Sequence, residues 1–276
     1  METRGRVFGD DEDWIAYLRD VVARPEAHPE VAPVPTGLST LEAAARETGH
    51  AARLADAALS LLEAGTDAER AVVQELAVHT APGAVSRLRA LLLRQDLPPA
   101  TRVRCASELL VASREDPMGL AVLREVLGGG DPVAASPRLA GAEHRLALLG
   151  AARHLPEWPG GWIRRVPPDD ALLLALWKAT PAPRRRALVE AVAAAGPDHL
   201  DALIVGARHL VRTSRDQAAP LMKMLAPHLA DPTSGEIVVE AMVGSLRANR
   251  KDPRQAELAE RILRKHDIWP KKPDND

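Results

Sequence analysis

The stretch PPATRVRCASELLVASREDPMGLAVLREVLGGGDPV, residues 98–133, predicts two short antiparallel helices joined by a tight turn. Apolar residues recur in each half at the spacing of one helical face. They are Val103, Ala106, Leu109 and Leu110 in the first half and Leu120, Leu123 and Leu127 in the second. Asp116 is expected to cap the second helix, Pro117 suits its first turn, and the three glycines at 128–130 end it. The stretch therefore predicts one helical hairpin.

Helix-length segments of the same kind surround this hairpin. They are predicted over residues 13–24, 39–64, 66–79 and 85–92 before it, and over 143–155, 169–180, 183–195, 198–213, 216–230, 235–249 and 253–265 after it. Two capping-box patterns, which mark helix starts, are Ser39 with Glu42 and Thr66 with Glu69. The pair Gly49-His50 leaves open whether 39–64 is one long helix or two short ones. The proline-rich segment 25–35 predicts an extended connection.

The composition favours an all-α fold. Hydrophobic residues make up 46% of the 276, but almost all of them are Ala, Leu and Val, and aromatic residues make up only 3%. Ala and Leu are strong helix formers, whereas the β-branched and aromatic runs typical of strands are missing. One globular domain or one stack of helical pairs fits this length.

Charge and hydropathy limit the partners and the location. A formal net charge of −2 excludes a global basic field, so nucleic-acid binding would have to be local. The sequence has neither the apolar core of a signal peptide nor an uncharged run of membrane-spanning length, which predicts a cytoplasmic protein without a membrane partner. The single cysteine, Cys105, excludes an internal disulfide and is expected to be a small buried hydrophobe. The excess of arginine over lysine indicates a GC-rich bacterial genome.

Four segments share an apolar and basic pattern that resembles HEAT-type helical repeats. They are Val103-Arg104 followed by Ala106 and Leu109, ERAVVQEL at 69–76, EHRLALLGAARHL at 143–155 and PRRRALVEAVAAAG at 183–196. The resemblance covers residues 40–265, and the distance between corresponding positions brackets the period of helical-hairpin repeats. It implies a right-handed α-solenoid of antiparallel helix pairs, whose concave inner helices usually bind another macromolecule.

The resemblance also raises three enzyme classes built on HEAT-like scaffolds. Metal-dependent hydroxylases of this kind use His-Glu steps, but none of the nine histidines here is followed by Glu. Bilin lyases need a pocket for a tetrapyrrole, which an aromatic-poor sequence does not suggest. Alkylpurine DNA glycosylases need a basic groove with aromatics and a carboxylate, and this comparison stays open because arginines and tryptophans occur together between Trp158 and Arg215. Since the sequence shows no catalytic constellation, we expect no catalytic residue, no metal and no cofactor. The predicted function is a non-catalytic protein-interaction module, a scaffold, adaptor or immunity-type inhibitor.

A cluster of arginines and tryptophans supplies the candidate partner-binding residues. They are Trp158, Trp162, Arg164, Arg165, Arg184, Arg185, Arg186, Arg208 and Arg212. These side chains could form a basic patch for an acidic protein, or, as the alternative function, an aromatic and basic face that contacts phosphates and stacks on bases. The remaining possibility is structural: the arginines are a solvated helix start and Trp177 fills the core.

Residues 156–168 interrupt the predicted repeats with prolines, glycines and two tryptophans. Trp158 and Trp162 either plug the junction between the two solenoid halves or anchor a partner as interface hot spots. The interruption suggests four regions: a capping helix and linker at 1–36, a first solenoid half at 37–155, the interruption at 156–168, and a second half with a polar tail at 169–276.

Overall fold

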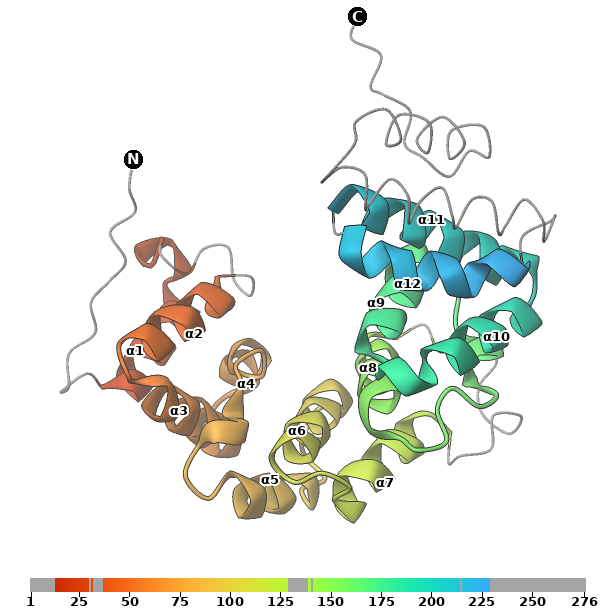
Figure 1. Ribbon diagram of the computed structural model, residues 1–276. Coiled ribbons are helices and arrows are strands. Elements are labelled where there is room, and N and C mark those ends of the chain that lie inside the picture. Colours follow the sequence, from red (N-terminus) through yellow and green to blue (C-terminus); the bar gives the residue numbers. More distant parts are fainter. Residues whose placement is uncertain are drawn as a thin grey trace, which may run out of the picture. The chain divides into compact units, whose positions relative to one another are not determined.

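A computed structural model describes residues 13–29, 31, 37–128, 139, 141–213 and 215–228 (Figure 1). In this part of the chain every regular element is an α-helix or a short 3₁₀ helix, and no strand is present. The protein is therefore all-α, as its composition predicts. The helices expected at 235–249 and 253–265 lie outside the described residues.

The chain divides into two compact units, each with its own packing. Unit 1 comprises Met1–Gly130 and Gly141–His154, and unit 2 comprises Asp131–Ala140 and Leu155–Asp276. The described α-helices of unit 1 are α1 Trp14–Ala23, α2 Leu38–Glu47, α3 Ala51–Ala64, α4 Asp67–Val73, α5 Ala84–Leu92, α6 Pro99–Ala112, α7 Pro117–Val126 and α8 Ala142–His154. Its 3₁₀ helices are η1 Pro25–Ala27 and η2 Val78–Thr80.

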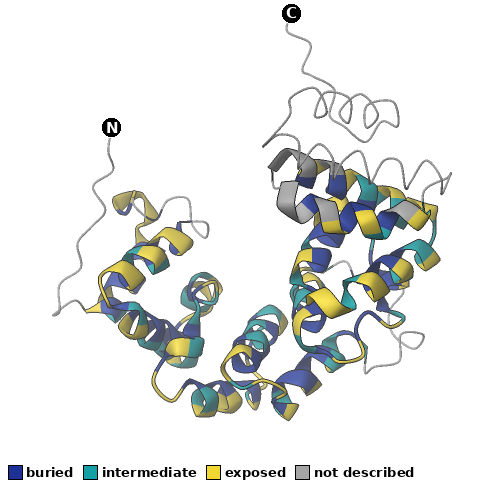
Figure 2. Ribbon diagram, viewed as in Figure 1, coloured by how far each residue is buried: buried dark blue, intermediate teal, exposed yellow. Residues whose placement is uncertain are grey.

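The hairpin predicted from residues 98–133 is formed by α6 and α7. The Asp116 side chain accepts hydrogen bonds from the backbone N–H groups of Met118 and Gly119, and Pro117 stands at the first helical position. Burial follows the predicted spacing, and Leu109 and Leu123 are completely buried. Buried and exposed segments alternate along the helices of this region (Figure 2). This local prediction is confirmed because the cap, the proline and the apolar spacing all lie within one short segment.

Cys105 lies inside the same hairpin, on α6. It is 1% exposed and has no disulfide partner. Burial raises the pKa of its thiol to about 12, which keeps the side chain a neutral hydrophobe. The prediction of a small buried residue is confirmed.

The structure decides one open alternative for the first helices and corrects one prediction. Residues 39–64 form two helices, α2 and α3, because Gly49 adopts a left-handed φ of 80° between them. The capping box predicted at Ser39 and Glu42 is wrong: α2 starts at Leu38, and its N-cap residue makes no side-chain hydrogen bond. The capping box at Thr66 and Glu69 is present, with Thr66 accepting from the Glu69 N–H and Glu69 accepting from the Thr66 N–H.

The helix predicted to continue through His79 is also shorter than expected. α4 ends at Val73, and the chain turns before it enters η2, which carries His79. Glu108 on α6 accepts a hydrogen bond from the backbone N–H of His79 at 3.2 Å. A buried carboxylate therefore supplies the acceptor that a continuing helix would have provided.

Unit 2 contains helices close to those predicted. Its described α-helices are α9 Asp170–Ala179, α10 Arg185–Ala195, α11 Pro197–Thr213 and α12 Arg215–Leu225, and its 3₁₀ helices are η3 Trp162–Arg165, η4 Ala182–Arg184 and η5 Ala226–His228. The Asp169 side chain caps α9 by accepting from the Leu172 N–H at 2.6 Å. α12 continues through Pro220, so this proline does not split the helix.

Within each unit, several helices contact the helix two places further along the chain. These contacts join α1 to α3, α3 to α5, α5 to α7 and α6 to α8 in unit 1, and α9 to α11 and α10 to α12 in unit 2. Two glycines show how closely the helices approach. A Cβ atom on Gly119 of α7 would lie 2.9 Å from Leu110 of α6, and one on Gly206 of α11 would lie 3.1 Å from the Asp170 carbonyl oxygen of α9.

Candidate binding site

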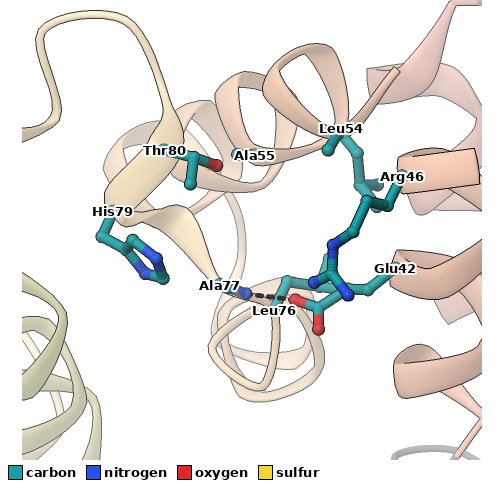
Figure 3. Close-up of a pocket in the computed structure, with 9 residues that line it drawn as sticks. Glu42, Arg46, Leu54, Ala55, Leu76, Ala77, His79 and Thr80 are labelled. Atoms are coloured by element: carbon teal, nitrogen blue, oxygen red, sulfur yellow. Dashed lines mark hydrogen bonds between the residues drawn. The ribbon is translucent and has the colours of Figure 1, made fainter. Parts of the chain in front are cut away.

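A small pocket opens in unit 1 between α2, α3 and the segment that carries η2 (Figure 3). Its volume is about 90 Å³. Apolar residues form its floor: the core residues Leu54, Ala55 and Leu76, and the half-buried Ala51. Polar side chains that differ in charge line the rest: Glu42, Arg46, His79 and Thr80. We call this site the Glu42 pocket.

Glu42 and Arg46 stand one helical turn apart on α2, so both face the same side of the helix. Oε1 of Glu42 accepts a hydrogen bond from the backbone N–H of Ala77, shown as a dashed line in Figure 3. That N–H lies in the turn after α4 and has no helical acceptor, which explains why the carboxylate is held there. The second oxygen of Glu42 has no hydrogen-bond partner in the described part of the chain.

His79 is oriented by a buried carboxylate. Its Nδ1 lies 2.7 Å from Oε2 of Glu108, a residue that is 6% exposed. An ionised carboxylate can only accept hydrogen bonds, so the proton of a neutral imidazole is on Nδ1 and Nε2 keeps its lone pair. Nε2 has no partner among the described residues. The imidazole therefore offers the pocket a fixed ring and an available hydrogen-bond acceptor.

Glu108 is the centre of a short polar network inside unit 1. Besides His79, it lies 3.7 Å from the guanidinium of Arg104, one turn earlier on α6. Arg104 itself donates to the backbone carbonyl oxygens of Gln74 and Glu75 at the end of α4. The network satisfies a buried charge and at the same time ties α6 to the segment that holds His79.

Arg46 is the one lining residue of the Glu42 pocket that carries a full positive charge. Its side chain is exposed and forms no ion pair or hydrogen bond in the described part of the chain. In Figure 3, Arg46 and His79 approach the pocket from opposite sides. A free guanidinium at the edge of an apolar floor is suited to a carboxylate, because its N–H groups match the two oxygens.

The tryptophans predicted as partner contacts are buried inside unit 2. Trp158 is 3% exposed and Trp162 is 2% exposed, and their rings stack with centroids 6.1 Å apart. Nε1 of Trp158 donates to Oγ1 of Thr180 at 3.0 Å. The burial of both rings therefore favours a packing role for this pair over a role as partner anchors. Trp177 is also buried, at 1% exposure, so none of these three indoles presents a face on which a base could stack.

The candidate arginines of unit 2 divide into three groups. Arg165 is buried, Arg184 donates to the Leu155 carbonyl oxygen, and Arg185 donates to the Thr180 carbonyl oxygen at 3.0 Å. Arg164 and Arg186 are exposed. Arg208 and Arg212 lie on α11, and their side chains are outside the description. The structure thus brings Arg184 and Arg185 into the unit's own packing and leaves Arg164 and Arg186 on the surface.

Sequence reasoning missed the Glu42 pocket. Glu42 matched a capping box, and His79 was placed on a helix, so neither was assigned to a site. The one available signal was Glu108, a carboxylate within the apolar run of α6 that would need a partner if buried.

Comparison of the chain with models of known protein families, with curated proteins and with solved structures finds no match. Among the described residues, no three His, Cys, Asp or Glu side chains come together in a way that could hold a metal ion. The same residues include no helix that is long and apolar enough to cross a membrane.

Proposed function

We propose that the chain is a right-handed α-solenoid of HEAT-like antiparallel helix pairs that works in the cytoplasm as a non-catalytic module for binding another protein. The observation that carries this proposal is the set of contacts between helices two places apart in the chain, such as α1 with α3 and α9 with α11. In a stack of hairpins each pair packs against the next, which produces contacts of this kind.

Polar contacts between successive helices of unit 1 support the same arrangement. Arg87 of α5 reaches back to α3, where it pairs with Glu63 at 2.6 Å. Arg89 of α5 reaches forward to Asp116 at the start of α7, also at 2.6 Å. One helix is therefore tied to both of its second neighbours. Such a stack presents a long, fixed surface, which suits binding of an extended partner.

Two exposed residues of unit 2 provide a basic contact for an acidic protein. Arg164 and Arg186 remain from the sequence-predicted set as exposed arginines, and neither forms an ion pair in the described part of the chain. Exposed charges of this kind act mainly on association rate and salt dependence.

Affinity purification of the tagged full chain from cells that make it, combined with chemical cross-linking and mass spectrometry, tests the proposal. We expect one protein in near-stoichiometric amount, cross-linked to described helices and retained after nuclease treatment. Capture that nuclease abolishes would assign the chain to nucleic acid instead. Absence of any protein above the tag-only control at low salt would overturn the proposal.

A further inference from the structure

We infer that the Glu42 pocket receives the carboxy-terminal residue of the partner, with a small aliphatic side chain on its floor. The inference rests on the proposed function, because it names the part of a protein partner that this site would recognise. A C-terminal residue combines three groups on one carbon atom: a carboxylate, a backbone N–H and a side chain. Each has a counterpart in the pocket.

The carboxylate has its counterpart in Arg46. This guanidinium is exposed and has no ion-pair partner in the described part of the chain, so binding an anion breaks no ion pair. Arginine binds carboxylates through two parallel N–H···O hydrogen bonds. Recognition of a terminal carboxylate by a guanidinium therefore needs no rearrangement of the helices.

The N–H has its counterpart in two acceptors. Glu42 keeps one oxygen free after accepting from Ala77, and His79 presents Nε2 because Glu108 holds its other nitrogen. The two charges of the pocket also select against simpler ligands. Glu42 disfavours an anion that brings no hydrogen-bond donor, and Arg46 disfavours a cation that brings no acceptor. A carboxylate with a donor next to it satisfies both.

The side chain has its counterpart in the apolar floor. Leu54, Ala55 and Leu76 are each at most 2% exposed, so they form a fixed surface rather than a mobile one. An apolar cavity of about 150 Å³ holds a benzene molecule. A pocket of about 90 Å³ therefore takes a smaller group, such as the side chain of alanine or valine.

The test uses the full chain and N-acetylated tripeptides that end in Gly-Gly-Ala, Gly-Gly-Val or Gly-Gly-Leu with a free carboxylate. Binding is followed by NMR through the imidazole signal of His79, which is assigned by its loss in His79→Gln. We expect a saturable shift of this signal with at least one peptide, and an affinity at least about tenfold lower for the same peptide as its C-terminal amide. The free amino acid is measured in parallel.

Two arginine variants provide the matched comparison. Arg46→Gln should weaken peptide binding by about tenfold or more, whereas Arg145→Gln should not change it. Arg145 is an exposed arginine of α8 that forms no side-chain contact in the described part of the chain and does not line the pocket. Circular dichroism of both variants should match that of the unchanged protein, since neither residue is buried.

Three results would overturn the inference: equal binding of acid and amide, tighter binding of the free amino acid than of the acetylated peptide, or no shift with any peptide at about 10 mM. Its failure is distinguishable from failure of the proposed function. A partner captured equally by the unchanged chain and by Arg46→Gln removes the pocket from recognition and leaves the protein-binding function in place. If the chain binds the peptides but captures no protein, the pocket keeps its ligand class and the proposed protein-binding function fails.

Discussion

Unit 1 and unit 2 are both built of helices, but the arginines of α5 in unit 1 and those at the start of α10 in unit 2 have different partners. In unit 1, arginines of α5 pair with carboxylates on neighbouring helices: Arg87 with Asp56 and Glu63, and Arg89 with Asp116. In unit 2, Arg184 and Arg185 donate to backbone carbonyl oxygens. The first arrangement joins helices by charge, and the second satisfies polar backbone groups around an aromatic core.

The two units also differ in the kinds of side chain that fill their cores. Buried side chains of α3 and α5 in unit 1 are all Leu and Ala, and the buried aromatic residues of α1 are Trp14 and Tyr17. Unit 2 instead buries three indoles in and near its irregular segment, those of Trp158, Trp162 and Trp177. Arg185 covers Trp177, with its guanidinium carbon 4.3 Å from the ring centroid. Small aliphatic side chains let helices approach closely, while large indoles fill the space under an irregular segment. The two units should therefore respond differently to cavities, acid and salt.

The largest effect is expected from Trp162→Ala in unit 2. The ring is 2% exposed and stacks on Trp158, so its removal leaves a large cavity and should lower the free energy of unfolding by about 3–5 kcal/mol. Urea denaturation followed by circular dichroism measures it. Arg164→Ala, an exposed change two residues away, is the control and should shift stability by less than about 0.5 kcal/mol. A Trp162→Ala variant as stable as this control would mean that the indole does not fill the core.

Leucine truncations provide the corresponding test for unit 1. Leu109 of α6 and Leu123 of α7 are both completely buried in the hairpin that these two helices form. Each change to alanine should cost about 2–5 kcal/mol, a range that depends on how far the neighbouring helices can close the cavity. Leu93→Ala is the control because Leu93 is 69% exposed. If the urea denaturation midpoints of Leu109→Ala and of the control coincide, Leu109 does not face the core and the buried face assigned to α6 is wrong.

The hairpin was predictable from sequence for the same reason that these leucines matter. Its cap, its proline and its apolar spacing lie within one segment, so the local pattern was sufficient to predict both helices. The Glu42 pocket was not predictable because its contacts join distant parts of the chain. Glu42 and Ala77 are 35 residues apart, and His79 and Glu108 are 29 apart. Side chains with a plausible local role gave no sign of these partners.

The tryptophans of unit 2 show the same limit. Their positions in a Pro/Gly segment fitted either burial or exposure, and the decision depends on Thr180, which is 22 residues from Trp158. The partners of the Trp158 N–H and of the buried Glu108 carboxylate could not be predicted for a related reason, because each lies more than 20 residues away along the chain. Local sequence therefore predicted the helices well, and tertiary contacts decided which polar side chains form a site.

Acid should weaken the α5–α7 contact of unit 1. Burial alone would raise the pKa of the Asp116 carboxyl, but hydrogen bonds from Arg89 and from the Gly119 and Met118 N–H groups outweigh it, so the pKa lies below its ordinary value of 3.8. A lowered pKa in the folded state adds stability that is fully present above pH 3.8 and is lost as the pH falls through the lower folded-state value.

The variant Asp116→Asn isolates this contribution. Asparagine still caps a helix but carries no charge, so the variant should be about 1–2 kcal/mol less stable than the unchanged protein at neutral pH. The difference should shrink as the pH falls below 3.8, because the unfolded chain then binds a proton at Asp116 that the folded protein binds only at its lower pKa. Urea midpoints measured from neutral pH downward check this, and a difference that stays constant across the range would contradict the role of the charge.

The smallest effect, and the sharpest comparison between the units, is expected from changing Arg87 and Arg185 to lysine in separate variants. Arg87 binds Glu63 through two hydrogen bonds of 2.7 and 2.6 Å, which raise the pKa of Arg87, and its side chain is 25% exposed. Arg87→Lys loses this paired geometry and should cost about 0.5–1 kcal/mol at low salt, less in about 1 M salt, because ion pairs are screened. Arg185→Lys loses hydrogen bonds to neutral carbonyl oxygens and the contact with Trp177, so its cost should depend much less on salt. Urea midpoints of both variants at the two salt concentrations decide the point: equal salt dependence would show that the arginines of the two units do not stabilise them in different ways.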